Sequence, residues 1–471
     1  SATTTAAPET AGAAEPADTT FEYYGTNPFE DPEREPLSTF AVDVDTGSYT
    51  LMRAWIEEGH LPDPDSVRVE EYVNYFDGGY DAPEDSTFAV YADGGPTPFW
   101  GSRNDLLRIG IKAREVADRR RQDLNLTLVV DVSGSMADRG KLEMVQDALE
   151  ILVDELDRFD TVGIVAYNER AEVVLEPTEA SDRDALVDAI RELRAGGTTN
   201  AEEGLLLGYD LADDSFIRDG INRVVLLSDG VANVGNTGPE QILATVGEHS
   251  RRGIDLVTIG VGIETYNDVL LEQLADQGDG WYAYVDTLDE AERLFCEHLT
   301  TSFETVARDV KVQVEFDPGY VEEYRLVGFE NRDVADEDFR NDDVDAGDVN
   351  AGHSVTALYE VALTRDAYRS DAAFGTVRVR WTDAETGRVD EIDGNLHAGL
   401  LADRFADSNA GFQVAATVAA YAEVLRDSRW VRGLDLGDVL YEADRIQWGD
   451  VAGHEGAEFH ELLERAVRLS G

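Results

Sequence analysis

A polar turn between a buried strand and an amphipathic helix is the feature that most limits how this chain can fold. Asp131, Ser133 and Ser135 lie in the sequence DVSGSM, directly after the apolar stretch 124–130. Leucine and valine then recur at helical spacing over residues 142–156. A strand, a turn and a helix in this order predict one unit of an open α/β sheet, which usually binds ligands at the carboxyl ends of its strands. One carboxylate and two hydroxyl groups at that edge offer hard oxygen ligands for a small divalent cation.

The alternation of strands and helices continues over residues 124–303 and predicts a doubly wound, mostly parallel sheet. Its strands are expected at 124–130, 162–167, 171–175, 223–228, 255–261 and 281–285. The piece at 171–175 follows a tight turn, so we expect it as an antiparallel edge strand. Strand patterns without intervening helices lie on both sides of this unit, at 88–92 and 105–113 before it and between 310 and 381 after it. We therefore predict a β-sandwich-like domain that is split by the inserted α/β unit.

Two further motifs follow the first in the order known from one protein family. The sequence Asp-x-Ser-x-Ser after a strand resembles the metal-ion-dependent adhesion site of the von Willebrand factor A (VWA) domain. Residues 196–200 (GGTTN) resemble the threonine loop of that family, and residues 227–230 (LSDG) resemble its second aspartate turn. The resemblance implies a Rossmann-like VWA fold for the α/β unit. It also implies that five residues hold the metal ion: Asp131, Ser133, Ser135, Thr199 and Asp229.

The resemblance also implies how such a site works. The serine and threonine hydroxyl groups would bind the ion directly and the two aspartates mainly through water, so little negative charge surrounds it. The ion is expected to be Mg²⁺, with Mn²⁺ and Ca²⁺ as alternatives, and one open position would take an Asp or Glu carboxylate from a protein partner. Thr198 and Thr199 cannot be separated by their chemistry. Thr199 is favoured because it keeps the family's spacing to residues 204–205, and Thr198 is the alternative.

The remaining parts of the chain resemble a bacterial subfamily. Residues 36–49 and 67–76 are similar to the N-terminal region of the YfbK-like VWA proteins. We expect five parts, which are a flexible tether at 1–36, an N-terminal segment of the split β domain at 37–123, the VWA domain at 124–303, the continued β domain at 304–397 and a helical region at 398–471. In the last part, apolar stripes at 414–425 and 459–467 have helical spacing and are expected in a core.

The charge of the chain excludes some functions. With 98 acidic and 39 basic residues, the formal net charge is −59, and only three of the basic residues are lysines. Phosphate neutralisation needs basic patches that this chain lacks, so we expect no nucleic-acid binding. The acidic residues are spread over folded segments, which indicates a surface adapted to concentrated salt. Cys296 is the single cysteine, which excludes an intrachain disulfide and a cysteine-rich metal site.

The composition of residues 1–20 gives an indication of where in the cell the protein lies. Residues 1–20 are rich in Ala, Thr, Pro and Glu and are typical of a tether. No apolar stretch approaches the ~20 residues that span a bilayer. Because such tethers often separate an exported domain from its anchor, we expect an extracytoplasmic protein with a membrane anchor upstream of residue 1.

Three weaker patterns have plain structural explanations. The acidic run 343–348 lacks the downstream glutamate of a calcium loop, so we interpret it as a solvated loop. Asp43 and Asp45 share one strand face and could approach a cation, but polar residues at a strand end explain them as well. The histidines of 454–460 lie six positions apart, which does not match a zinc signature on a helix.

The leading functional hypothesis is a metal-dependent protein-binding module for adhesion or assembly, without enzymatic activity. The alternative is an intracellular VWA adaptor for an AAA+ ATPase, which would be a separate chain because no Walker motif is present. A metal-activated hydrolase is a third hypothesis, but no general base is available apart from Asp131 and Asp229. None of the seven histidines lies in a nucleophile motif, which argues against a serine hydrolase at Ser133.

Overall fold

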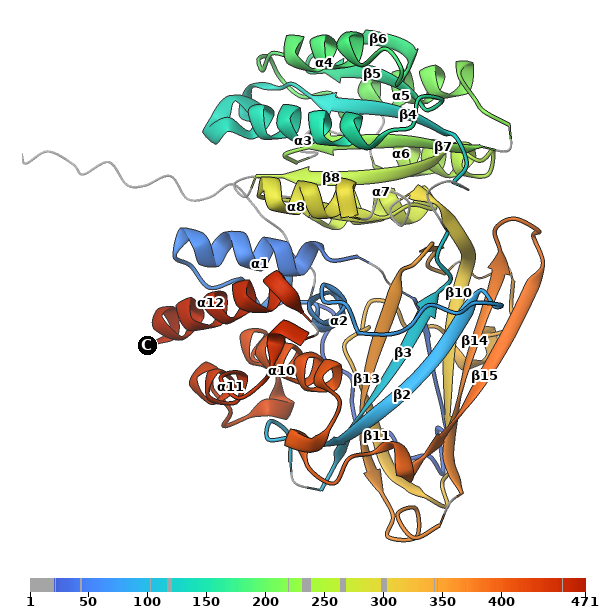
Figure 1. The fold of residues 1–471 in the computed structure, drawn as a ribbon, viewed down its shortest axis with the longest axis vertical. Coiled ribbons are helices and arrows are strands. Elements are labelled where there is room, and N and C mark those ends of the chain that lie inside the picture. Colours follow the sequence, from blue (N-terminus) through green and yellow to red (C-terminus); the bar gives the residue numbers. More distant parts are fainter. Residues whose placement is uncertain are drawn as a thin grey trace, which may run out of the picture.

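The chain folds into an α/β unit, a β-sandwich and a group of helices beside the sandwich (Figure 1). The computed structural model describes residues 21, 23–42, 45–101, 103–116, 121–218, 220–230, 239–262, 268–297, 303–342, 344, 346–370, 372–450 and 452–471. Among these residues, no helix is both long and apolar enough to cross a membrane.

The α/β unit has a sheet in the order β6-β5-β4-β7-β8-β9, in which every pairing is parallel except that of the edge strand β6. Its strands are β4 (Leu124–Asp131), β5 (Thr161–Tyr167), β6 (Ala171–Glu179), β7 (Ile221–Ser228), β8 (Asp255–Val261) and β9 (Tyr282–Val285). Its helices are α3 (Lys141–Glu155), α4 (Arg183–Glu192), α5 (Ala201–Asp214), α6 (Pro239–Ser250), α7 (Asp268–Gln277) and α8 (Leu288–Glu292).

The apolar side chains of the central strand β4 point alternately to the two faces of the sheet, which explains why both faces carry helices. Leu126, Leu128 and Val130 of β4 pack with α3, α4 and α8, whereas Val129 packs on the other face with α5, α6 and α7. All eight residues of β4 are buried, as expected for a central strand between two helix layers. The predicted doubly wound sheet with an antiparallel edge strand is confirmed.

Residues before and after the α/β unit share the two sheets of the sandwich. One sheet has the order β1-β10-β14-β15 with β12 beside β10, and the other has the order β11-β13-β3-β2. The strands are β1 (Leu37–Ala41), β2 (Phe88–Pro96), β3 (Asp105–Ala113), β10 (Thr305–Phe316), β11 (Val321–Val327), β12 (Val349–Asn350), β13 (Ser354–Leu363), β14 (Ala373–Asp383) and β15 (Val389–His397). Because β1 pairs with β10 and β3 pairs with β13, the α/β unit is an insertion in the β-sandwich, as predicted.

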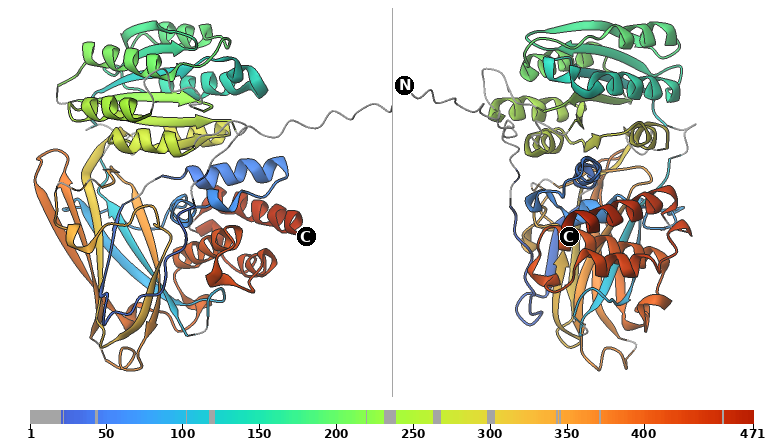
Figure 2. Two further views of the ribbon diagram at one scale, coloured as in Figure 1. Left: turned by 180° about the vertical axis from the view of Figure 1, so that it is seen from behind. Right: turned by 90° about the vertical axis from the view of Figure 1, so that its left-hand side faces the viewer.

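Helices from both ends of the chain form a third core. They are α1 (Gly47–Glu58), α2 (Val69–Asn74), α10 (Ala410–Leu425), α11 (Leu436–Ala443) and α12 (Gly453–Ser470). Short helical turns are η1 (Pro64–Ser66), η3 (Gly134–Gly140), η4 (Arg293–Glu297), η5 (Asp336–Asp338), η6 (Ala398–Leu400), η7 (Phe405–Asp407), η8 (Arg429–Val431) and η9 (Trp448–Asp450). The apolar stripes predicted at 414–425 and 459–467 lie in this core. Figure 2 shows α1 between the α/β unit and the C-terminal helices.

Part of the predicted tether packs against the fold. Asn27 Nδ2 donates to the carbonyl oxygen of Gly328 over 2.8 Å, and Glu30 forms a β-bridge with Tyr324. The ring of Phe29 meets Trp430 edge to face, with centroids 5.0 Å apart. Residues 23–36 are therefore joined to the sandwich and to the C-terminal helical region. Residues 1–20 lie outside the described residues.

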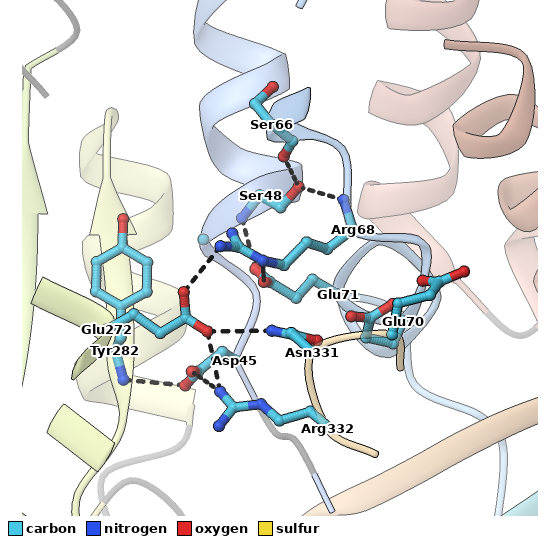
Figure 3. A network of polar contacts seen from close by, with 12 residues as sticks. Asp45, Ser48, Ser66, Arg68, Glu70, Glu71, Glu272, Tyr282, Asn331 and Arg332 are labelled. Atoms are coloured by element: carbon cyan, nitrogen blue, oxygen red, sulfur yellow. Dashed lines mark hydrogen bonds and ion pairs between the residues drawn. The ribbon is translucent and has the colours of Figure 1, made fainter. Parts of the chain in front are cut away.

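Buried charges join the α/β unit to the flanking segments (Figure 3). Glu272 of α7 accepts hydrogen bonds from Arg68, over 2.9 Å, and from Arg332, over 3.2 Å. Asp45 Oδ1 accepts from the backbone N–H of Tyr282 in β9 over 3.0 Å. Because Arg68 precedes the inserted unit and Arg332 follows it, both halves of the surrounding domain bind the same helix.

A second buried arginine makes a similar connection. Arg53 of α1 is 2% exposed and donates to Asp286 Oδ2 over 2.9 Å and to Glu290 Oε2 over 2.8 Å. It also donates to Glu458 of α12 over 3.2 Å. Burial lowers the pKa of Arg53, but Asp286 and Glu290 outweigh this effect and raise it. One guanidinium group thus holds the α/β unit, α1 and α12 together.

Replacement of Arg53 by methionine is expected to lower the free energy of unfolding by about 3–5 kcal/mol, because the buried Asp286 loses the arginine that pairs with it, whereas Glu290 keeps Arg293. Urea unfolding in molar KCl measures this change. Arg34→Met is the matched control, because Arg34 is exposed and lies 3.8 Å from Asp31. We expect the control to change stability by less than about 0.5 kcal/mol. Equal effects of the two substitutions would contradict the proposed role of Arg53.

Candidate metal centre

Two neighbouring parallel strands bring the two predicted aspartates to one edge of the α/β sheet. β4 ends at Asp131, and β7 ends at Ser228, so that Asp229 is the next residue. The strands pair in parallel with Val130 opposite Leu227. Because parallel strands present their carboxyl ends at the same edge, residues distant in sequence become neighbours here.

The serine turn is hydrogen-bonded to both aspartates. Ser133 N donates to Asp131 Oδ1 over 2.8 Å. The hydroxyl oxygens of Ser133 and Ser135 are 3.1 Å apart, and Ser135 Oγ donates to Asp229 Oδ1 over 3.1 Å. Asp131, Ser133 and Asp229 are each at most 2% exposed. We call this group the oxygen cluster, and it consists of Asp131, Ser133, Ser135 and Asp229.

The predicted threonine loop lies against the serine turn. Gly196 N donates to Val132 O over 2.8 Å, and Gly134 N donates to Gly197 O over 3.0 Å. Gly197 has a φ of +90°, which glycine adopts without strain. Within the described residues, Thr199 makes no hydrogen bond to the oxygen cluster, and it is half-buried whereas Thr198 is exposed. The structure thus places the loop beside the cluster, and the choice of Thr199 over Thr198 stays a prediction.

Two buried hydroxyl groups behind the cluster were missed at the level of sequence. Asp131 Oδ2 accepts from Ser228 Oγ over 3.0 Å and from the Tyr167 hydroxyl over 3.3 Å. Burial raises the pKa of Asp131, the charge of Asp229 raises it further, and the hydrogen bonds from Ser133 and Ser228 oppose the shift. Ser228 and Tyr167 end the two strands that flank β4, and this position at the ligand-binding edge is the signal that could have identified them.

A lysine was also missed. Lys141 Nζ donates to Asp229 Oδ2 over 2.8 Å, and the lysine is 6% exposed. Lys141 is the first residue of α3, so the helix that follows the serine turn places its ammonium group at the second aspartate. Its signal in the sequence is its rarity, because the chain has only two other lysines.

The spacing of the cluster fits a small hard cation. An octahedral Mg²⁺ shell with metal–oxygen distances of roughly 2.0–2.1 Å has adjacent ligand oxygens about 3.0 Å apart. The two serine hydroxyl oxygens, 3.1 Å apart, match this spacing, and Asp229 Oδ1 lies 3.1 Å from Ser135 Oγ. In the described part of the chain, no group of three or more histidine, cysteine or acidic side chains is placed to hold a metal ion. An ion at this edge would therefore depend on the serine hydroxyl oxygens.

The weaker sequence patterns do not form a second site within the described residues. Asp45 pairs with an arginine of the β domain over 3.3 Å, and Asp348 pairs with another over 3.2 Å. His460 is hydrogen-bonded to Asp444 over 2.7 Å. Four features lie outside the described residues, namely Asp43, Asp343, Asp345 and the side chain of Cys296.

Comparison with family models divides the chain into three matched regions. Residues 125–296 match the von Willebrand factor type A domain, and residues 301–469 match the C-terminal region of the uncharacterized protein YfbK. A further von Willebrand factor model matches residues 15–108. The matched regions thus include both the inserted unit and the segments around it.

Individual proteins are also similar to this chain. The uncharacterized protein YfbK of Escherichia coli (strain K12) is 34% identical in an alignment 480 positions long, which covers 96% of this chain and 82% of that protein. The human inter-alpha-trypsin inhibitor heavy chain H3 is 28% identical over 165 residues, which are 33% of this chain and 18% of that protein. A solved von Willebrand factor type A protein from Catenulispora acidiphila has 18% identity and a TM-score of 0.45, covering 82% of this chain and 88% of that one.

Replacement of Asp131 by asparagine is expected to separate stability from ion binding. The raised pKa of Asp131 shows that burial disfavours its charged form. In EDTA, a neutral side chain of the same shape should therefore unfold at the same temperature as wild type or a few degrees higher. In Mg²⁺, the variant should bind the ion at least about tenfold more weakly, because one ligand charge is lost. Thermal unfolding followed by circular dichroism and calorimetric titration measure the two effects.

Asp160→Asn is the control for this prediction. Asp160 is also buried, but it pairs with Arg121 over 2.7 Å and accepts from Leu124 N over 2.8 Å at the start of β4. Its neutralisation leaves Arg121 with only the exposed Asp157, 3.4 Å away, so the unfolding temperature should fall. A lower unfolding temperature for Asp131→Asn in EDTA would contradict the argument.

Proposed function

Because the chain belongs to the YfbK family of bacterial proteins with a von Willebrand factor type A domain, we propose that it is a metal-dependent protein-binding module that captures a carboxylate of a partner protein. Domains of this type are typically protein-interaction or adhesion modules and are mostly not enzymes. The observation that carries the proposal is the oxygen cluster, whose two serine hydroxyl oxygens have the spacing of adjacent oxygens in an Mg²⁺ ligand shell, with Ser135 Oγ hydrogen-bonded to the neighbouring Asp229.

The proposed ion is Mg²⁺. Ser133 and Ser135 would be direct ligands, Asp131 and Asp229 would act mainly through water, and Thr199 would add a further hydroxyl oxygen. Mn²⁺ is the natural substitute, because Ca²⁺ requires longer metal–oxygen distances, which would spread the cluster. The hydrogen bonds from Ser228 and Tyr167 to Asp131 support this arrangement, because they fix the carboxylate before an ion arrives.

The proposed ligand is an Asp or Glu side chain of another protein. The oxygens bound directly to the ion would be neutral hydroxyls, with the aspartates one water away, so an anionic oxygen at the open position would be attracted strongly. Because the partner's carboxylate would bind to the ion itself, binding of the partner would require a divalent ion. We place the activity outside the cytoplasm, in adhesion or assembly at the cell surface, because residues 1–20 have the composition of a tether.

Titration of Mg²⁺ into metal-stripped protein in molar KCl tests the ion site. We expect one ion to bind per chain and the double variant Ser133→Ala/Ser135→Ala to lose this binding, because it removes two ligand oxygens and leaves the fold's core unchanged. Isothermal titration calorimetry measures the affinity. Ser181→Ala is the matched control, because Ser181 is an exposed serine of the same unit. Wild-type affinity in the double variant would overturn the assignment of the ligands.

Exchange of chloride for acetate tests the capture of a carboxylate. At equal ionic strength and equal free Mg²⁺, acetate should raise the apparent Mg²⁺ affinity, because it occupies the open position. An acetate dissociation constant of about 0.1 M would give a roughly tenfold increase in molar acetate. Formate should act in the same way and perchlorate should not. Equal Mg²⁺ affinity in all these salts would contradict carboxylate capture and leave the ion site itself intact.

A further inference from the structure

Lys141 is a cation at a position where its own helix disfavours one. It is the first residue of α3, and the N-terminus of a helix carries a partial positive charge that favours anions. It is also almost fully buried, which penalises the charge of an unpaired ammonium group. Its presence there needs a compensating anion, and Asp229 provides it over 2.8 Å.

The two oxygens of Asp229 have separate partners. Oδ1 accepts from Ser135 Oγ within the oxygen cluster, and Oδ2 accepts from Lys141 Nζ. Lys141 can therefore keep its contact while Oδ1 serves the ion or its bound water. The ammonium group acts as a neighbour of the site and does not occupy the position of the ion.

The end of β8 leaves room for the lysine side chain. Gly262 follows β8 with a φ of +81°, and a Cβ atom added to it would come within 2.4 Å of Lys141 Cε. Any other residue at this position would thus collide with the aliphatic part of the lysine. The site of Lys141 is therefore built by three elements, which are α3, the turn after β7 and the turn after β8.

We propose that Lys141 is a built-in counter-charge that leaves the ion-loaded site with one net positive charge. This inference rests on the proposed function. Asp131 and Asp229 together offset the double charge of Mg²⁺, and Lys141 adds one positive charge beside them. The lysine weakens the binding of the ion alone. It also leaves a net charge that one carboxylate of a partner neutralises, so that ion and partner bind together.

The test compares Mg²⁺ affinity among variants of the full chain in molar KCl. Lys141→Met keeps the aliphatic volume and removes the charge, and it should bind Mg²⁺ about tenfold more tightly or more, given a single charge at a distance of several ångströms. Lys112→Met is the matched control, because Lys112 lies in β3 and donates to Gly352 O over 2.6 Å. The control should have wild-type affinity. Calorimetry gives the affinities.

Thermal unfolding is the second measurement. Without metal, Lys141→Met leaves two buried carboxylates without a cation, so its unfolding temperature should lie below that of wild type. Saturating Mg²⁺ should then raise the unfolding temperature of the variant more than that of wild type, because a ligand stabilises by its affinity for the folded state. Lys141→Gln removes the same charge and can still donate a hydrogen bond to Asp229, so it is measured beside Lys141→Met.

The outcomes separate this inference from the proposed function. Unchanged or weaker Mg²⁺ binding by Lys141→Met and Lys141→Gln, with wild-type binding intact, would overturn the role of Lys141 and leave the metal site standing. Tighter binding by both variants supports the counter-charge, even where wild type binds too weakly to measure. Absence of binding in wild type and in both variants would overturn the metal site and the inference together.

Discussion

The pairing of β4 with β7 decides where the two aspartates of the candidate site lie. Their parallel register places the ends of both strands at one edge, so Asp131 and Asp229 become neighbours. β5 pairs with the other side of β4, and its last residue, Tyr167, lies opposite Asp131 and donates a hydrogen bond to it from its hydroxyl group. A shift of either strand by one residue would turn its last side chain to the opposite face. The apolar cores on both faces of the sheet oppose such a shift, so the packing of the unit also fixes the geometry of the site.

The charge distribution of the chain makes its few basic residues important. Arginines such as Arg53, Arg68 and Arg332 lie at the contacts between the α/β unit and its surroundings. Buried ion pairs of this kind contribute little net stability compared with apolar packing, but the loss of one partner is costly. The main effect of these pairs is therefore to define how the α/β unit is oriented on the surrounding domain. Their net contribution to the free energy of unfolding is small. Most of the acidic excess has no such role and remains as surface charge, which concentrated salt screens within ~3 Å.

The features that could be predicted are those that a short stretch of sequence indicates by itself. The DVSGSM turn, the second aspartate turn and the strand-helix alternation each depend on a short stretch, and the fold class followed from them. Lys141, Ser228 and Tyr167 were missed because their roles depend on neighbouring strands and on the direction of a side chain. β15 was also missed, because alternating acidic residues in Val389–His397 resemble a loop, although the strand pairs with β14 at the sheet edge. Residues 23–36 were assigned to the tether because the anchoring contacts of Phe29 and Asn27 are made with distant parts of the chain.

The proposed capture of a carboxylate by an acidic protein raises an electrostatic conflict, which the geometry of the site would resolve at short range. The net charge of −59 repels an anionic partner over long distances in dilute salt. At molar salt this repulsion extends only ~3 Å into solution, whereas charges inside the protein are screened much less. The attraction of a partner then depends on the few groups at the sheet edge. Among these groups Lys141 is the buried cation next to Asp229, and its charge has the sign that a carboxylate requires. A strongly acidic surface and an anion-binding site are therefore compatible when the surface charge is screened and the local charge is buried.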